Sequence, residues 1–288
     1  MSLTSRALSC ALIAVAPIAT ISAQAPTRNL SIDFRTTVIV QGQPDTGIII
    51  GHAIGSADKI RMDLTMKGTG SQVTPLATDG VMTMIVSDTG KTVTYLDTKN
   101  SHYIRMRPAE MFAQMQQMGA KMDLSNTKAT VDSLGAGPVI LGHPTQHYRV
   151  GTGMTMNINA MGQQQTVNIA STSDYYYATD IKGEVNPFAN LSGADMASAF
   201  TGTSKEFADK LKAAQAKLPK ATPLKATSSA TMTVSGQTRV TSTDAVVTAI
   251  KWVDADPKTF EIPASYTPLQ MPGLNGPPPS GGAIPPAQ

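Results

Sequence analysis

The chain has 288 residues, of which 41% are hydrophobic and 15% charged, and 23 Lys and Arg against 20 Asp and Glu give a formal net charge of +3. So small a charge excludes a strong electrostatic attraction to nucleic acid. About 240 residues between the two ends are enough for a sizeable hydrophobic core.

The N-terminus has the pattern of a secretory signal peptide: Arg6, an apolar run over residues 7–21, and small residues that favour cleavage after Ala23. A lipoprotein anchor is the alternative, but Cys10 precedes most of the apolar run instead of following it. Cleavage leaves 22 bases against 20 acids and removes the only cysteine. We therefore expect a periplasmic or secreted protein without a disulfide, a thiol nucleophile or a cysteine-bound metal.

Alternation of apolar and polar residues dominates the chain from residue 28 onward. Even positions from 30 to 40 and from 60 to 66 are largely apolar, and the intervening positions are largely polar. A period of two predicts strands with one buried face, and pairs such as Ser235-Gly236 predict hairpin turns between them. Further strands are expected at 46–54, 81–87, 91–97, 101–106, 127–134, 138–150, 153–160, 164–171, 173–181, 224–234, 237–243 and 245–253.

Two segments have helical spacing instead. Over residues 108–122, Pro108 suits a first helical turn and four methionines fall on one face. Over residues 203–219, Thr203 and Glu206 form a capping box and Pro219 ends the pattern. A looser helical pattern covers 187–200. The expected apolar stripes are Met111, Met115, Met118 and Met122 in the first helix, and Phe207, Leu211, Ala214 and Leu218 in the second.

Two histidines, His143 and His147, lie four residues apart and raise the question of a metal site. On a strand, four residues separate them by roughly 13 Å, too far for one ion. Pro144 disfavours a helix there, and the following residues alternate as in a strand. We interpret this segment as a turn that leads into a strand, and expect no metal and no cofactor.

Local catalytic motifs are missing from the sequence: it has no Gly-x-Ser-x-Gly, no His-Glu-x-x-His and no phosphate-binding glycine loop. We therefore expect a protein that is not an enzyme, while a hydrolase assembled from distant segments stays open as a third hypothesis. A small basic cluster at Lys99, His102, Arg105 and Arg107 fits a solvated strand face better than a site for anionic lipid headgroups or an acidic partner.

Methionines are frequent on the faces that should be buried. Methionine is flexible and polarizable, so it fills a core and also lines cavities that accept varied apolar ligands. The residues expected to face such a cavity are Phe34, Met62, Leu64, Met66, Met82, Met84, Met115 and Tyr176.

Several segments resemble a known family: YLDTKNSHYIRMRP, LGHPTQHYRV, SDYYYATDI, TPLKATSSATM and the closing KWVDADPKTFEIPASYTPL. Over most of residues 28–268 the chain resembles exported bacterial proteins with the domain of unknown function 4412. More remotely, the layout is similar to periplasmic lipoprotein carriers of the LolA type. The resemblance implies an unclosed antiparallel barrel over helices, with a concave apolar face able to hold acyl chains, and it implies no catalytic residues.

Together these patterns predict an α+β protein that is mainly antiparallel β. We expect one open β-barrel or half-barrel domain over residues 24–270, covered on its concave face by two or three helices, between a signal peptide at 1–23 and a disordered Pro/Gly-rich tail at 271–288. The leading hypothesis is a non-enzymatic binding protein for a lipid, an acyl chain or a similar apolar ligand, without a transmembrane span or a nucleic-acid partner. The alternative is an envelope structural or interaction protein with a filled core and no ligand.

Overall fold

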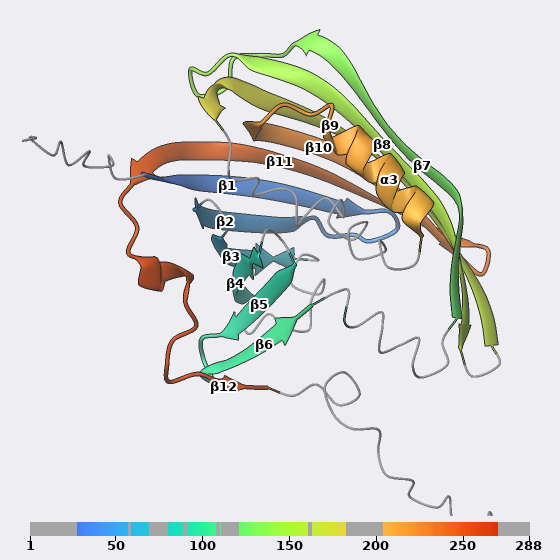
Figure 1. Cartoon of the computed structure of the whole chain (residues 1–288), viewed down its shortest axis with the longest axis horizontal. Helices are drawn as coiled ribbons and strands as arrows, with labels where there is room; N and C mark the ends of the chain where they lie inside the picture. Colours follow the sequence, from blue (N-terminus) through green and yellow to red (C-terminus); the bar gives the residue numbers. More distant parts are fainter. Residues whose placement is uncertain are drawn as a thin grey trace, which may run out of the picture.

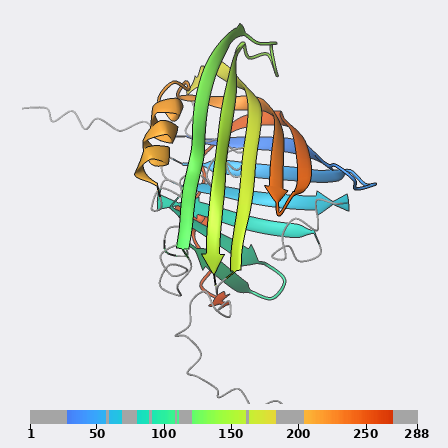
Figure 2. The same cartoon turned by 90° about the vertical axis from the view of Figure 1, so that its right-hand side faces the viewer.

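A computed structural model of the chain describes residues 28–56, 59–68, 80–88, 91–107, 110, 121–160, 163–182 and 204–269. The predicted signal peptide, the tail after Met271 and the predicted helical patch over 187–200 lie outside these residues. The described strands form a single 12-stranded sheet in the order β12-β6-β5-β4-β3-β2-β1-β11-β10-β9-β8-β7. The sheet curls strongly without closing, as Figures 1 and 2 show.

The sheet consists of two antiparallel meanders joined where β1 pairs with β11. Neighbouring strands are antiparallel throughout, except that the short β12 runs parallel to β6. The first meander is β1 Asn29–Val40, β2 Gly47–Gly55, β3 Ile60–Lys67, β4 Val81–Ser87, β5 Thr92–Asp97 and β6 His102–Met106. The second is β7 Lys121–Ala136, β8 Thr145–Ala160, β9 Gln163–Lys182, β10 Ala221–Val234 and β11 Gln237–Val253, and β12 is Thr267–Pro268.

Alternation places one set of side chains on each face of the sheet, as the sequence predicts. We call the face that carries Phe34 and Met62 the inner face, and the face that carries Arg35 and Asp174 the outer face. Residues that pair directly across strands share a face, so the registers extend this assignment from β1 to all its neighbours. The inner face holds the main hydrophobic core.

Strands of the second meander are longer than the sequence predicts. The strands expected at 164–171 and 173–181 form the one strand β9 of 20 residues, and those expected at 237–243 and 245–253 form β11 of 17 residues. The strands expected at 138–150 and 153–160 likewise run together in β8, because Gly151, Thr152 and Gly153 all pair with β9 in unbroken register. The two-residue turn at Ser235-Gly236 is confirmed, and both residues have positive φ.

The prediction that two or three helices cover the concave face is wrong. Within the described residues, α3, Lys205–Gln215, is the α-helix described over its whole length beside a 12-stranded sheet, and Glu110 is the other α-helical residue. The helix predicted over 108–122 fails at its end, because Lys121 and Met122 belong to β7 and pair with β8. Met111, Met115 and Met118 lie outside the described residues.

Helix α3 forms where the second helical pattern predicts it, with different ends. Ser204 caps it, since its side chain accepts a hydrogen bond from the Phe207 N–H at 3.3 Å, and the helix ends at Gln215, before Pro219. The buried stripe of Phe207, Leu211 and Ala214 is confirmed. The helix packs against β7 on the inner face, where the Lys210 Nζ donates to the Thr127 carbonyl at 3.0 Å.

The C-terminal segment covers part of the outer face. After β11, the short 3-10 helix η4, Pro257–Phe260, packs against β3, and the Arg61 guanidinium donates to the Thr259 carbonyl at 3.4 Å. On the same outer face, Ile85 and Leu96 are buried although they point away from the main core. The chain then pairs with β6 as β12 (Figure 1).

Candidate functional site

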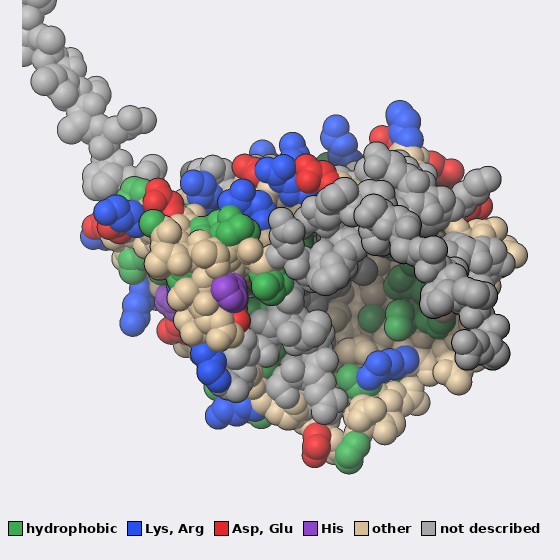
Figure 3. Space-filling view, turned by 90° about the horizontal axis from the view of Figure 1, so that it is seen from below, with side chains coloured by type: hydrophobic (Ala, Val, Ile, Leu, Met, Phe, Trp, Pro, Cys, Tyr) green, Lys and Arg blue, Asp and Glu red, His purple; other side chains and the backbone are tan. Residues whose placement is uncertain are grey.

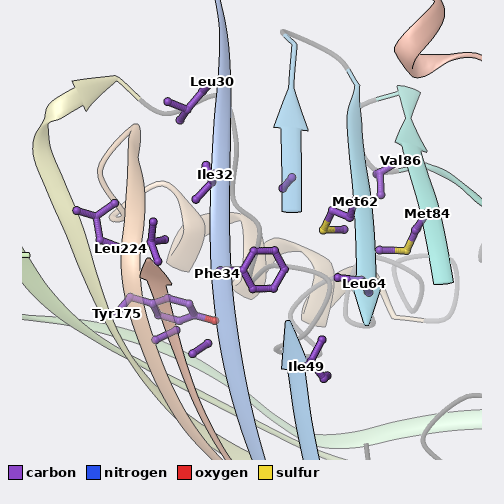
Figure 4. Packing of buried hydrophobic residues seen from close by; sticks show 14 of the residues in the cluster. Leu30, Ile32, Phe34, Ile49, Met62, Leu64, Met84, Val86, Tyr175 and Leu224 are labelled. Atoms are coloured by element: carbon purple, nitrogen blue, oxygen red, sulfur yellow. The ribbon is translucent and has the colours of Figure 1, made fainter. Parts of the chain in front are cut away.

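The inner face of the first meander, together with the adjoining parts of β9 to β11, is a closed apolar wall. Seven adjacent strands, β9–β11 and β1–β4, contribute side chains to it, and Figure 4 shows Phe34 between Leu64 on one side and Tyr175 on the other. We call this part of the inner face the closed region. Six of the predicted cavity residues lie in it, all less than 9% exposed: Phe34, Met62, Leu64, Met66, Met82 and Met84.

Phe34 occupies its place because its neighbour on β2 has no side chain. Gly51 pairs directly with Phe34, and a Cβ added at Gly51 would lie 2.2 Å from the Phe34 ring. The ring therefore covers the β2 backbone, and Leu64 packs on the next strand beside the same glycine. A glycine in a strand often marks such a close approach.

The inner face of the second meander is apolar and partly open. Met154 is buried against Phe207 and Leu211 of α3, and Met156 and Ile169 pack against this small cluster while remaining partly exposed. Towards the ends of the strands, Ile158 is also half-buried, and Met232 is 41% exposed. We call this part the open region; its members are Leu124, Met154, Met156, Ile158, Val167, Ile169, Met232 and Val234.

A hollow in the molecular surface carries hydrophobic side chains. Figure 3, which views the molecule from below, shows this group of hydrophobic side chains inside a recess, with a cationic side chain at its border. The register also places a cation next to the open region, because Arg239 pairs with Met232 on the inner face. The arrangement can hold an apolar molecule by contact, with water and one positive charge at its edge.

Tyr176 does not share the inner face with the other predicted residues. It lies on the outer face, where its ring stacks on the His147 ring with 4.5 Å between centroids and an angle of 13°. Its neighbours Tyr175 and Tyr177 are the buried ones, and burial raises the pKa of Tyr177. The remaining predicted residue, Met115, lies outside the described residues.

The two histidines that suggested a metal site bind two different aspartates on β9. The His147 Nε2 lies 2.9 Å from the Asp174 Oδ1, and the His143 Nδ1 lies 2.8 Å from the Asp180 Oδ2. His143 follows a turn at Leu141-Gly142, as the sequence predicts. In the part of the chain that the structure describes, no group of three potential metal ligands occurs.

Asp174 is the centre of a polar cluster on the outer face. The Arg149 guanidinium donates to both of its carboxylate oxygens, at 2.9 and 3.2 Å. Partial burial of Asp174 acts to raise its pKa, but the hydrogen bonds from Arg149 and His147 outweigh it and hold the pKa below its usual value. The cluster ties β8 to β9 and offers no nucleophile next to a free base.

A shallow recess of about 360 Å³ lies beside Asp174 on the outer face. It exists because the side chains there are small: Thr172, Ser229 and Ser242 lie side by side across three strands. The sequence shows these residues only as the polar half of an alternation, which does not mark a recess.

The basic cluster is occupied by contacts within the chain. The Arg105 guanidinium lies 5.8 Å from the centre of the Tyr103 ring, the Arg107 Nη1 is 3.0 Å from the Glu110 Oε1, and the His102 Nδ1 is 2.7 Å from the Thr267 Oγ1. These contacts agree with the interpretation of a solvated strand face.

No protein-family model and no curated protein matches the chain. Among solved structures, the chain is similar to the crystal structure of an outer membrane lipoprotein-sorting protein domain from Vibrio parahaemolyticus, with a TM-score of 0.28 and 8% identity over 81% of this chain and 88% of that one. A TM-score of this size does not establish a shared fold, so we draw no function from it. None of the helices in the described parts of the chain is long and apolar enough to span a membrane.

Proposed function

We propose that the protein is an exported, non-enzymatic binding protein that holds an elongated apolar ligand, such as a lipid or an acyl chain, against the open region. The observation that carries the proposal is the partial exposure of an apolar surface that continues from a closed core. Met156, Ile158, Ile169 and Met232 share one face of three adjacent strands and are not fully covered by α3. A connected apolar surface of this kind in a folded protein marks a binding site.

The composition of the surface supports a ligand that varies in shape. Methionine contributes three members of the open region, and its unbranched side chain adapts to different partners. An acyl chain gains roughly 0.8 kcal/mol for each methylene that it removes from water. A chain of several methylenes therefore binds without a specific polar contact.

The test is a native mass measurement on the mature chain purified from a bacterial envelope, together with uptake of the uncharged apolar dye N-phenyl-1-naphthylamine. We expect a stoichiometric apolar adduct, and loss of uptake in Met232→Lys, which places a second cation beside Arg239 on the inner face. Thr231→Lys is the matched control, because Thr231 is the adjacent residue on β10 and points to the outer face. Equal uptake by the two variants would show that the open region is not the binding site.

A second function is favoured by the closed region. Met62 is 0% exposed and Phe34 1% exposed, so the first meander packs as an ordinary core. A packed core of this kind is all that an envelope structural or interaction protein needs. A clean mass without adduct, combined with no uptake of N-phenyl-1-naphthylamine, would favour that function.

A further inference from the structure

A belt of hydroxyl side chains crosses the inner face between the closed and the open regions. Thr243, Ser228 and Ser173 pair directly across β11, β10 and β9, so they lie side by side on one face. In the next row, Ser171 of β9 pairs with Thr152 of β8. We call these five residues, together with Thr36 of β1, the hydroxyl belt. Thr36 is diagonal to Thr243, since it pairs with Ala245 and Val38 pairs with Thr243.

The belt interrupts an apolar surface. On one side of it lie Tyr175 and Ala226 of the closed region, and on the other lie Met154 and Ile169 of the open region. Serine and threonine at these positions lose solvation that valine or alanine would not lose. Four of them offset this cost by pairing: Thr152 Oγ1 with Ser171 Oγ, and Ser228 Oγ with Thr243 Oγ1, each at 2.7 Å.

Each hydroxyl pair keeps unused hydrogen-bonding capacity. A hydroxyl has one donor and two acceptor positions, so one hydrogen bond within a pair leaves a donor and several lone pairs for a third group. All four paired side chains are half-buried, so a ligand in the open region can reach them. An array with both donors and acceptors suits a polar group of either kind.

At its buried end, the belt has a hydroxyl without a partner. Thr36 is 1% exposed, and its Oγ1 makes no hydrogen bond within the described structure. A buried polar atom of this kind is uncommon and calls for an explanation. The other such atom, the Thr222 Oγ1, lies beside an irregular register at the start of β10 and is not part of the belt.

Charge is missing from the two rows that contain the five belt residues other than Thr36. One row reads Val38, Thr243, Ser228, Ser173 and Val150, and the other reads Val40, Thr241, Ala230, Ser171 and Thr152. The cation that the register places closest on this face is Arg239, one row beyond Thr241. A buried carboxylate or phosphate needs a cationic or multiply hydrogen-bonded partner, which these rows do not offer.

We propose that the hydroxyl belt binds an uncharged polar group of the apolar ligand, such as an ester, an alcohol or an amide, while the ligand's hydrocarbon chain lies along the open region. This inference rests on the proposed function and narrows its ligand class to neutral lipids. Fatty-acid anions and phosphate headgroups are disfavoured at the belt. The polar group accepts from or donates to Ser228 and Thr243, and Thr36 completes its hydrogen bonds if the group enters deeply.

The test compares three probes of similar length on the full mature chain: octadecane, methyl palmitate and palmitate, each measured by displacement of N-phenyl-1-naphthylamine. We expect methyl palmitate to bind about three- to tenfold more tightly than octadecane, which is the gain from one or two net hydrogen bonds. Palmitate should bind more weakly than methyl palmitate at neutral pH. The double variant Ser228→Ala and Thr243→Val should bind both uncharged probes equally.

The matched control is Thr233→Val with Thr238→Val. This pair joins the same two strands through hydroxyls 3.0 Å apart, but it is exposed on the outer face, so its loss should leave the preference for the ester unchanged. Thr36→Val serves as a second variant that removes the partnerless hydroxyl without a change of shape. Equal binding of ester and hydrocarbon by the unaltered chain would overturn the proposed role of the hydroxyl belt, while the proposal that the protein binds an apolar ligand would stand. No displacement by any probe would overturn the proposed function itself.

Discussion

The closed and open regions share one face of one sheet but differ in how far their strands run. In the closed region, β4 and β5 have 7 and 6 residues, or about 20 Å at 3.3 Å per residue. In the open region, β8 and β9 have 16 and 20 residues, or roughly 50 to 65 Å. The same alternation therefore buries most inner side chains of the short strands and leaves part of an apolar wall uncovered along the long ones. The extra length of β8 and β9, which carries their apolar face beyond the main core, distinguishes the candidate site from that core.

Replacing one methionine in the closed region and one in the open region tests the comparison most strongly. Met62 is 0% exposed and Met232 is 41% exposed, on the same face. We expect Met62→Ala to lower the free energy of unfolding by about 2–5 kcal/mol, because it leaves a cavity in a packed core. Met232→Ala should cost less than about 1 kcal/mol, since a mostly exposed side chain loses little burial. Urea unfolding of the two variants measures both values, and similar losses would break the division.

A second, smaller effect is expected where Phe34 covers Gly51. The methyl group of Gly51→Ala would lie 2.2 Å from the Phe34 ring, so the ring must move, at a cost of about 1–3 kcal/mol. Gly153→Ala is the control in the long strands, because its Cβ would meet its nearest atom at 3.7 Å, an ordinary contact. Adding Phe34→Leu should recover part of the loss in Gly51→Ala, and a double-mutant cycle by urea unfolding measures the coupling. Simple additivity of the two changes would show that the ring and the glycine do not share this space.

The sequence predicts most of the strands because alternation is a local property of the chain. It places Phe34, Met62 and Leu64 on one face, as observed. It fails at Tyr176 because three consecutive tyrosines conceal which parity faces inward. It fails at Met122 because a residue four after Met118 and two before Leu124 satisfies both a helical and a strand period.

Strand length and the hydroxyl belt depend on partners that are distant in sequence. Gly151 and Gly153 indicate a turn locally, yet β9 pairs with them and carries the strand through. The hydroxyl belt comes from five strands, and only their register shows that Ser173, Ser228 and Thr243 lie side by side. No local pattern in the sequence contains this information. The sequence shows which positions carry hydroxyl residues, but it does not show that these residues lie side by side in the sheet.

The smallest expected effect is a difference in local stability between the two regions at low pH. Asp174 has a lowered pKa in the folded chain, so its contribution to stability is present above the unfolded pKa of about 3.9 and is lost as the pH falls through the folded value. The contribution should stay below about 1 kcal/mol, because solvent screens a partly exposed ion pair. Its partners Arg149 and His147 are on β8, so the loss loosens the junction of β8 with β9 and not the closed region.

Amide hydrogen exchange between pH 5 and pH 3 should therefore speed up in β8 and β9 before it does in β1 to β4, after correction for the intrinsic rate. Asp174→Asn should exchange faster in β8 and β9 already at pH 5 and show a smaller change with pH there. Uniform acceleration across all strands would mean that the sheet opens as one unit and that the two regions are not separate in stability.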